Sequence, residues 1–192
     1  MTDHNGTPAS ALPDPPASDP IAETRRWLER AVIGLNLCPF AKAVYAKQQV
    51  RFVLSDATTP EALLHQLGEE LALLRETPAE QIDTTLLVHP QVLTDFLDYN
   101  DFLDDADALL EALDLDGDLQ VASFHPDYQF ADSDVDDLAN CTNRSPYPTL
   151  HLLREDSVER AVAIYPDPDA IVARNIETLE KLGRERWQTL LD

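Results

Sequence analysis

The feature that most constrains this chain is an alternation of short β-branched runs with longer segments of helical period. Runs typical of strands occupy residues 49–55, 84–88, 119–124 and 149–153. Segments with apolar residues every three or four positions precede the first run, separate the first three runs, and follow the last. Strands joined by helices favour right-handed crossovers and parallel pairing. The sequence therefore predicts an α/β (or α+β) fold, with a small, mostly parallel sheet of about four strands and helices packed around it.

N-cap residues and prolines indicate where the helices begin, and the loss of hydrophobic period indicates where regular structure stops. Asp19 and Pro20 are typical of an N-cap and a first turn, and they predict a helix that ends near Leu37. Residues 168–190 are expected to form one long closing helix. Residues 126–148 have no period of either kind, and a loop of this length is more often functional than idle. The strand that follows this loop could run in either direction.

Charge and composition exclude several classes of protein. The chain carries 36 acidic and 14 basic side chains, a formal charge of -22, which repels phosphate backbones and anionic membrane surfaces. No stretch approaches the roughly 20 apolar residues of a membrane span, and the N-terminus lacks a signal-peptide pattern. The two cysteines lack the spacing of a zinc ribbon. We expect an acidic cytoplasmic protein without nucleic-acid or membrane partners, with a disordered tail at residues 1–19 and a single domain at residues 20–192.

Two His-Pro pairs follow predicted strands directly. His89 precedes Pro90, and His125 precedes Pro126. If the two strands are parallel, both imidazoles lie at the same carboxyl edge of the sheet, where open α/β sheets place their ligands. They are candidate catalytic bases. The alternative is structural, because proline removes a hydrogen-bond donor and ends a strand.

Cys38 is a candidate nucleophile. It precedes Pro39, which is expected to open a short helix with Cys38 as its N-cap. The positive end of that helix, with Lys42 one turn further along, would lower the pKa of the thiol. The alternative is a buried structural cysteine beside neighbouring apolar residues, which is the commoner fate of a lone cysteine.

Two segments without acidic residues retain basic ones. The first lies between Glu29 and Asp56, and the second is residues 138–154, which include Arg144 and Arg154. A local positive pocket in an anionic protein would attract a small anion, such as a carboxylate or a phosphate. Buried strands are also free of acids, which explains part of each gap.

The turn at residues 143–148 is constrained by two prolines around Tyr147. Arg144 could make a forked contact to an oxyanion, with the Asn143 amide beside it. Alternatively, these residues only fix the long loop. In the following strand, His151 lies on the opposite face from Leu150, as a ligand-binding residue or as a satisfied core histidine.

The residues that carry these motifs resemble a known family. Residues 34–40, 124–126 and 143–155 are similar to the signatures of a bacterial family catalogued as domain of unknown function 1415. The resemblance covers nearly everything after the N-terminal tail and implies a cytosolic bacterial protein of this size. It implies no activity, and it marks six positions without assigning roles: Cys38, His125, Asn143, Arg144, His151 and Arg154.

Three functions are compatible with the sequence. In the first, the protein is an enzyme, or a relative of one, that acts on a small anionic metabolite, with Cys38 as nucleophile and His89 or His125 as base. In the second, Cys38 and the histidines bind zinc or iron. In the third, the long loop of a non-catalytic module binds a ligand or a protein. The first is our prediction, and neither a cofactor nor an oligomeric state can be predicted.

Overall fold

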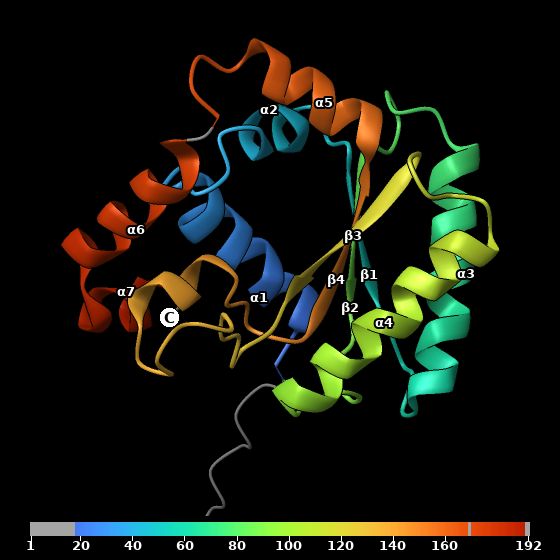
Figure 1. Ribbon diagram of the computed structural model, residues 1–192, viewed down its shortest axis with the longest axis horizontal. Helices are drawn as coiled ribbons and strands as arrows, with labels where there is room; N and C mark the ends of the chain where they lie inside the picture. The colour runs from blue at the N-terminus through green and yellow to red at the C-terminus, as the bar shows by residue number, and fades with distance from the viewer. Residues whose placement is uncertain (1–17, 169, 191–192) are drawn as a thin grey trace, which may run out of the picture.

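The fold is built on one sheet of four strands, ordered β1-β2-β4-β3 (Figure 1). A computed structural model of the chain describes residues 18–168 and 170–190. The strands are β1 (Val50–Leu54), β2 (Thr84–Val88), β3 (Leu119–Phe124) and β4 (Thr149–Arg154). The tail expected to be disordered, residues 1–19, falls outside the described residues except for its last two positions. The predicted α/β class is confirmed.

The prediction of a mostly parallel sheet is wrong, because the sheet is mixed. Only β1 and β2 pair in parallel, whereas β4 lies between β2 and β3 and is antiparallel to both. The first three strands do share one direction, as the helical crossovers between them require. The crossover to β3 leaves a space beside β2, and the long connection after β3 lets the chain reverse and fill it with β4.

Two helices cover one face of the sheet (Figure 1). They are α3 (Pro60–Glu76), which begins after the N-cap Thr59, and α4 (Phe96–Ala112), which begins after the N-cap Asp95. Their apolar stripes meet every second side chain of β2 and β4 in a core that includes Leu63, Leu67, Leu71, Leu74, Leu87, Tyr99, Phe102, Leu150 and Leu152. The face of β4 opposite these leucines is the face of His151.

The remaining helices lie on the other face of the sheet (Figure 1). They are α1 (Pro20–Trp27), the π-helical segment η1 (Leu28–Ile33), α2 (Ala41–Ala46), α5 (Glu155–Ile164), α6 (Ala170–Leu182) and α7 (Arg184–Leu190). A second apolar core joins α1, η1, α6 and α7 to the sheet and includes Trp27, Ala31, Val32, Leu37, Leu86, Leu179 and Trp187. The long loop after β3 contains a short 3-10 helix, η2 (Leu138–Thr142), which packs on α6.

Three predicted helices differ from the structure. The helix expected to end near Leu37 is α-helical only to Trp27, continues as the π-helical η1 and ends at Ile33. The closing helix is divided into α6 and α7 because Gly183 adopts a φ of 78°, in the left-handed region that glycine enters without steric penalty. The helix expected to begin at Pro39 begins at Ala41 instead, with Phe40 as its N-cap. Cys38 therefore lies in the turn before α2 and not at the N-cap, and its amide donates to the carbonyl of Val32 at 3.4 Å. Within the described ranges, no helix is long and apolar enough to cross a membrane.

Candidate functional site

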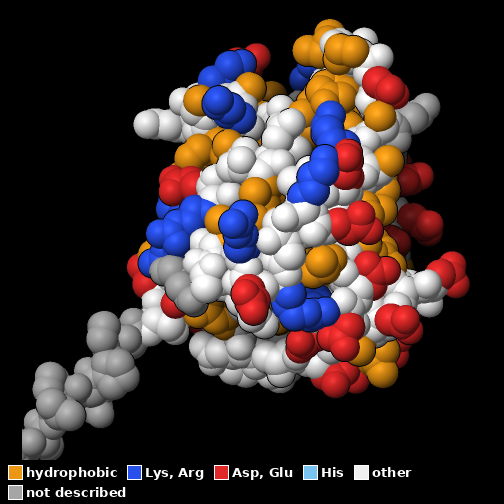
Figure 2. Space-filling view, turned by 90° about the vertical axis from the view of Figure 1, so that its left-hand side faces the viewer, with side chains coloured by type: hydrophobic (Ala, Val, Ile, Leu, Met, Phe, Trp, Pro, Cys, Tyr) orange, Lys and Arg blue, Asp and Glu red, His pale blue; other side chains and the backbone are white. Residues whose placement is uncertain are grey.

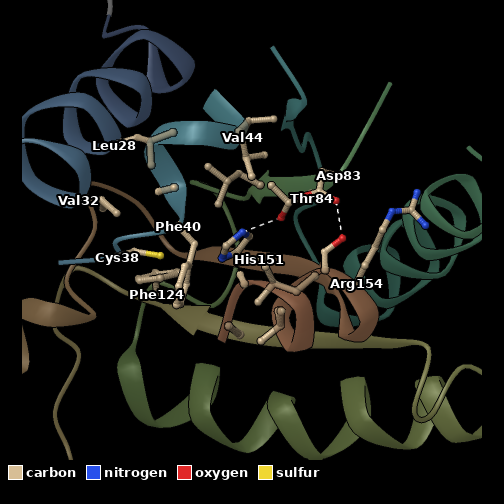
Figure 3. A pocket seen from close by; sticks show the side chains of 18 of the residues that line it. Leu28, Val32, Cys38, Phe40, Val44, Asp83, Thr84, Phe124, His151 and Arg154 are labelled. Carbon is tan, nitrogen blue, oxygen red and sulfur yellow. Dashed lines mark hydrogen bonds between the residues drawn. The ribbon is translucent and has the colours of Figure 1, made fainter. Parts of the chain in front are cut away.

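A cavity of about 340 Å³ lies between the sheet and the helices α1, α2 and α5 (Figure 3). Alternate positions of three neighbouring strands form its floor, including Thr84 of β2, Ala122 of β3 and His151 of β4. Small side chains leave this space open, because Ala122 is the register partner of His151 and Ala161 of α5 faces the same cavity. The walls are apolar and include Trp27, Leu28, Val32, Phe40 and Val44.

His151 is the central polar group of this cavity. Its Nε2 lies 2.7 Å from the hydroxyl of Thr84, and that hydroxyl donates its own hydrogen to the carbonyl of Leu152 at 2.6 Å (Figure 3). Nε2 must therefore carry the imidazole proton, and Nδ1 keeps a lone pair. Burial lowers the pKa of His151 to about 4, so the ring is neutral at pH 7. It offers the cavity a hydrogen-bond acceptor.

Cys38 reaches the same cavity from the turn before α2. The side chain is half-buried, and its sulfur points into the cavity near Phe40 and Phe124 (Figure 3). Lys42, expected to activate this thiol, is exposed on α2 and does not line the cavity. The thiol and His151, which the sequence separates widely, are thus brought together. A neutral imidazole with a pKa of about 4 is a weak acceptor for a thiol proton at neutral pH.

Asp83 and Ser157 border this cavity beside the first turn of α5. The hydroxyl of Ser157 donates to a carboxylate oxygen of Asp83 at 2.6 Å (Figure 3), and Arg160 donates to the same hydroxyl at 3.0 Å. Asp83 is the acidic residue in the lining. The polar groups here add a second acceptor, a carboxylate, to the lone pair of His151.

His89 and His125 lie at the same edge of the sheet but on its opposite face. Each follows a residue that pairs with Thr149, so the two imidazoles flank the start of β4. Both are fully buried, and Tyr99 of α4 lies between them, with ring centroids 5.7 Å from His89 and 5.1 Å from His125. They belong to the layer of α3 and α4, whereas Cys38 belongs to the layer of α1 and α2.

The hydrogen bonds of these two histidines secure the loops that follow β2 and β3. Nδ1 of His89 donates to the carbonyl of Val92 at 3.0 Å. In His125, Nδ1 accepts from the amide of Asp127 at 3.0 Å and Nε2 donates to the carbonyl of Leu93 at 3.3 Å. Burial lowers the pKa of His125 and lowers that of His89 to about 4. The geometry is that of neutral structural histidines.

Arg154 reaches the cavity only with its aliphatic part. Its guanidinium turns away from the cavity (Figure 3) and donates to the carbonyls of Leu74, Thr77 and Ile82. These carbonyls belong to the last turn of α3 and the segment after it, where a helix leaves its acceptors unpaired. Arg154 therefore joins β4 to the end of α3.

The residues of the constrained turn also make internal contacts. The guanidinium of Arg144 donates to the carbonyls of Tyr128 at 3.1 Å and Val135 at 2.9 Å, which holds the long loop. The amide nitrogen of Asn143 donates to the carbonyl of Ser123 at 3.2 Å. Tyr147 donates to a carboxylate oxygen of Glu23 at 2.7 Å. The basic side chains of this segment do not converge on the cavity.

The candidate ligands for a metal are dispersed. Cys38 and His151 share the cavity, whereas His89 and His125 lie across the sheet from it. Among residues 18–168 and 170–190, no group of three or more His, Cys, Asp or Glu side chains is close enough to hold a metal ion.

Sequence reasoning missed several cavity residues. Thr84, Ala122 and Ala161 had no motif around them, and Asp83 looked like an ordinary residue before a strand. One signal was present: His151 and the alanine of β3 both occupy positions where a strand facing a helix layer usually carries a large apolar side chain. Recognising the shared face required the strand order, which the sequence does not state.

Comparison with known proteins identifies a family and nothing more specific. No curated protein matches the chain, and no solved structure does. A family model described as "Protein of unknown function (DUF1415)" matches residues 19–189, which is almost the whole chain. The chain therefore belongs to the DUF1415 family.

Proposed function

We propose that this protein binds a small, largely apolar organic molecule in the cavity between the sheet and α1, α2 and α5. The observation that carries the proposal is the cavity itself, of about 340 Å³, with apolar walls around a few polar groups. Cavities of roughly 300–1,000 Å³ lined in this way are typical sites for small molecules. His151 would fix the orientation of the ligand.

The arrangement of charges favours an apolar ligand over the small anion expected from the sequence. The guanidinium groups of Arg144 and Arg154 are hydrogen-bonded to backbone carbonyls, and Lys42 points elsewhere. Asp83 borders the cavity with a carboxylate. A buried anion without a cationic partner loses several kcal/mol of hydration free energy, about the size of a whole binding free energy.

An enzymatic role for Cys38 with a histidine base stays a prediction. His89 and His125 face the other layer, and His151 is a weak base. Binding without chemistry needs none of these groups to react. We therefore expect Cys38→Ala to retain ligand binding.

The proposal is tested with N-phenyl-1-naphthylamine, a neutral dye that fluoresces strongly in apolar surroundings. We expect saturable fluorescence with the wild-type protein and a loss of at least about tenfold in affinity in Ala161→Phe, where the added ring occupies the cavity. Ala163→Phe is the matched control, because Ala163 is exposed on the same helix and does not line the cavity.

Two outcomes would refute the proposal. One is the absence of saturable binding by the wild-type protein. The other is equal affinity of the dye for Ala161→Phe and Ala163→Phe when both variants show the circular dichroism spectrum of the wild type. In the second case the dye would be binding somewhere else on the molecule.

A further inference from the structure

A second cavity of about 490 Å³ adjoins the first. The two share three lining residues, Val32, Cys38 and Phe124. These side chains lie together on one side of the first cavity (Figure 3), so they form the boundary between the two spaces. The far side of the second cavity is formed by the long loop, through Ala139 and Asn143, and by α6.

The side-chain amide of Asn175, in α6, lines the second cavity in a fixed orientation. Only 8% of this residue is exposed, and its amide nitrogen donates to the carbonyl of Leu37 at 2.7 Å. A carbonyl can only accept, so the orientation of the amide is determined and its oxygen remains an acceptor. Among the residues that the structure describes, no donor is bonded to this oxygen.

Two other polar side chains of the second cavity already donate hydrogen bonds within the protein. The amide nitrogen of Asn143 donates to Ser123, as described above, and the hydroxyl of Thr142 donates to the carbonyl of Ala139 at 2.8 Å. The oxygen of Asn175, to which no protein donor is bonded in the described residues, therefore favours a ligand end that donates a hydrogen bond. In the first cavity the same is true of Nδ1 of His151.

We infer that the two cavities bind one elongated molecule that passes Cys38 and donates a hydrogen bond to the side-chain oxygen of Asn175. The ligand class is an uncharged amphiphile with an apolar chain and a hydroxyl or amide end. A carboxylate of the same chain length is disfavoured, because no Lys or Arg is among the described residues that line the second cavity and the charged end would lose its hydration without a cationic partner. This inference rests on the proposed function, since the chain of the ligand occupies the first cavity.

The chemistry of the ligand end is tested by displacing N-phenyl-1-naphthylamine with three compounds of one chain length. They are decan-1-ol, 1-methoxydecane, which keeps the oxygen but has no donor, and decanoate. We expect decan-1-ol to displace the dye at concentrations about tenfold lower than either of the others, because only it is uncharged and can donate a hydrogen bond to the oxygen of Asn175. Equal potency of the alcohol and the ether would overturn the assignment to Asn175.

The path of the ligand is tested by closing the second cavity alone. Ala139 lines the second cavity and not the first, and we expect Ala139→Phe to weaken decan-1-ol about tenfold while the dye still binds. Ala131→Phe is the control, at an exposed position of the same loop.

These results separate the two proposals. If the dye fails to bind the wild-type protein, the proposed function fails and the inference fails with it. If the dye binds and Ala161→Phe abolishes its binding, but Ala139→Phe leaves decan-1-ol unaffected, the first cavity is the whole site and only the inference is overturned.

Discussion

Protonation of His151 makes the stability of the protein depend on pH. Its pKa in the folded protein is about 4, below the 6.5 of a free imidazole. Between these two pH values the unfolded chain binds a proton at this residue and the folded chain does not. The stability associated with His151 is therefore complete above pH 6.5 and declines as the pH falls toward 4. His89, whose pKa is also lowered to about 4, acts in the same direction.

His151→Gln isolates this effect, because glutamine still offers an N–H to Thr84 but does not titrate. Between pH 7 and pH 4.5 we expect the free energy of unfolding to fall by about 2 kcal/mol less in the variant than in the wild type. Urea denaturation at the two pH values measures the difference. An identical decline in both proteins would mean that His151 is protonated as easily in the folded state as in the unfolded state.

The two cysteines are expected to differ in reactivity. Cys141 is 3% exposed, and burial raises the pKa of its thiol, whereas Cys38 is half-buried and reaches the cavity. Iodoacetamide should therefore alkylate Cys38 first, and bound N-phenyl-1-naphthylamine should slow that reaction. Mass spectrometry of peptides from the wild type, Cys38→Ala and Cys141→Ala assigns the sites. Faster labelling of Cys141, or no protection by the dye, would contradict the placement of Cys38.

At the scale of elements, Arg154 links strand β4 to the end of α3. Lysine has no planar fork and cannot reach the carbonyls of Leu74, Thr77 and Ile82 together. We expect Arg154→Lys to lower the free energy of unfolding by about 2 kcal/mol and to leave dye affinity unchanged. Denaturant titration checks the first effect and fluorescence the second.

The control for this prediction is Arg160→Lys, because Arg160 is exposed on α5 and its guanidinium donates to the hydroxyl of Ser157 on the same helix. It should change stability by less than about 0.5 kcal/mol. A tenfold loss of dye affinity in folded Arg154→Lys would show that this guanidinium takes part in binding.

Elements with strong local signals were predictable from the sequence. The runs that form β1 to β4 and the leucine stripe of α3 stand where hydrophobic period and helix caps indicate. Two features were not. The position of β4 between β2 and β3 depends on contacts across the whole chain, and the division of the closing helix depends on one glycine, Gly183, that a helical pattern can also tolerate.

The candidate site was predictable only in part, because it also depends on contacts across the whole chain. Cys38 and His151 were singled out from the sequence, and both line the cavity. The convergence of His89 and His125 at one edge followed from parallel strands, but the face on which they lie follows from the alternation of side chains after each strand end. Arg144 and Arg154 looked available because a sequence does not show which carbonyls need a donor.

The whole molecule is strongly anionic, and its charge is unevenly distributed. Helix α4 contains no Lys or Arg and exposes six acidic residues: Asp98, Asp101, Asp104, Asp105, Asp107 and Glu111. On the face shown in Figure 2, basic and acidic side chains are interspersed. Repulsion along α4 opposes folding and is screened by salt.

We therefore expect the midpoint of thermal unfolding to rise between about 20 mM and 500 mM sodium chloride, because the Debye length falls from about 20 Å to about 4 Å and the repulsion is screened. In Asp101→Asn/Asp105→Asn, which removes two like charges one turn apart, the rise should be smaller. Calorimetry at both salt concentrations makes the comparison. A midpoint that does not respond to salt, or an undiminished response in the double variant, would show that this repulsion does not limit stability.

The most direct test of the proposed binding site is a crystal structure of the protein saturated with N-phenyl-1-naphthylamine. We expect the dye over the face of the sheet that carries Ala122 and His151, beneath Ala161 of α5, with the hydrogen bond between His151 and Thr84 retained. Dye bound only on the outer surface, with the space above His151 filled by protein side chains, would contradict the proposal.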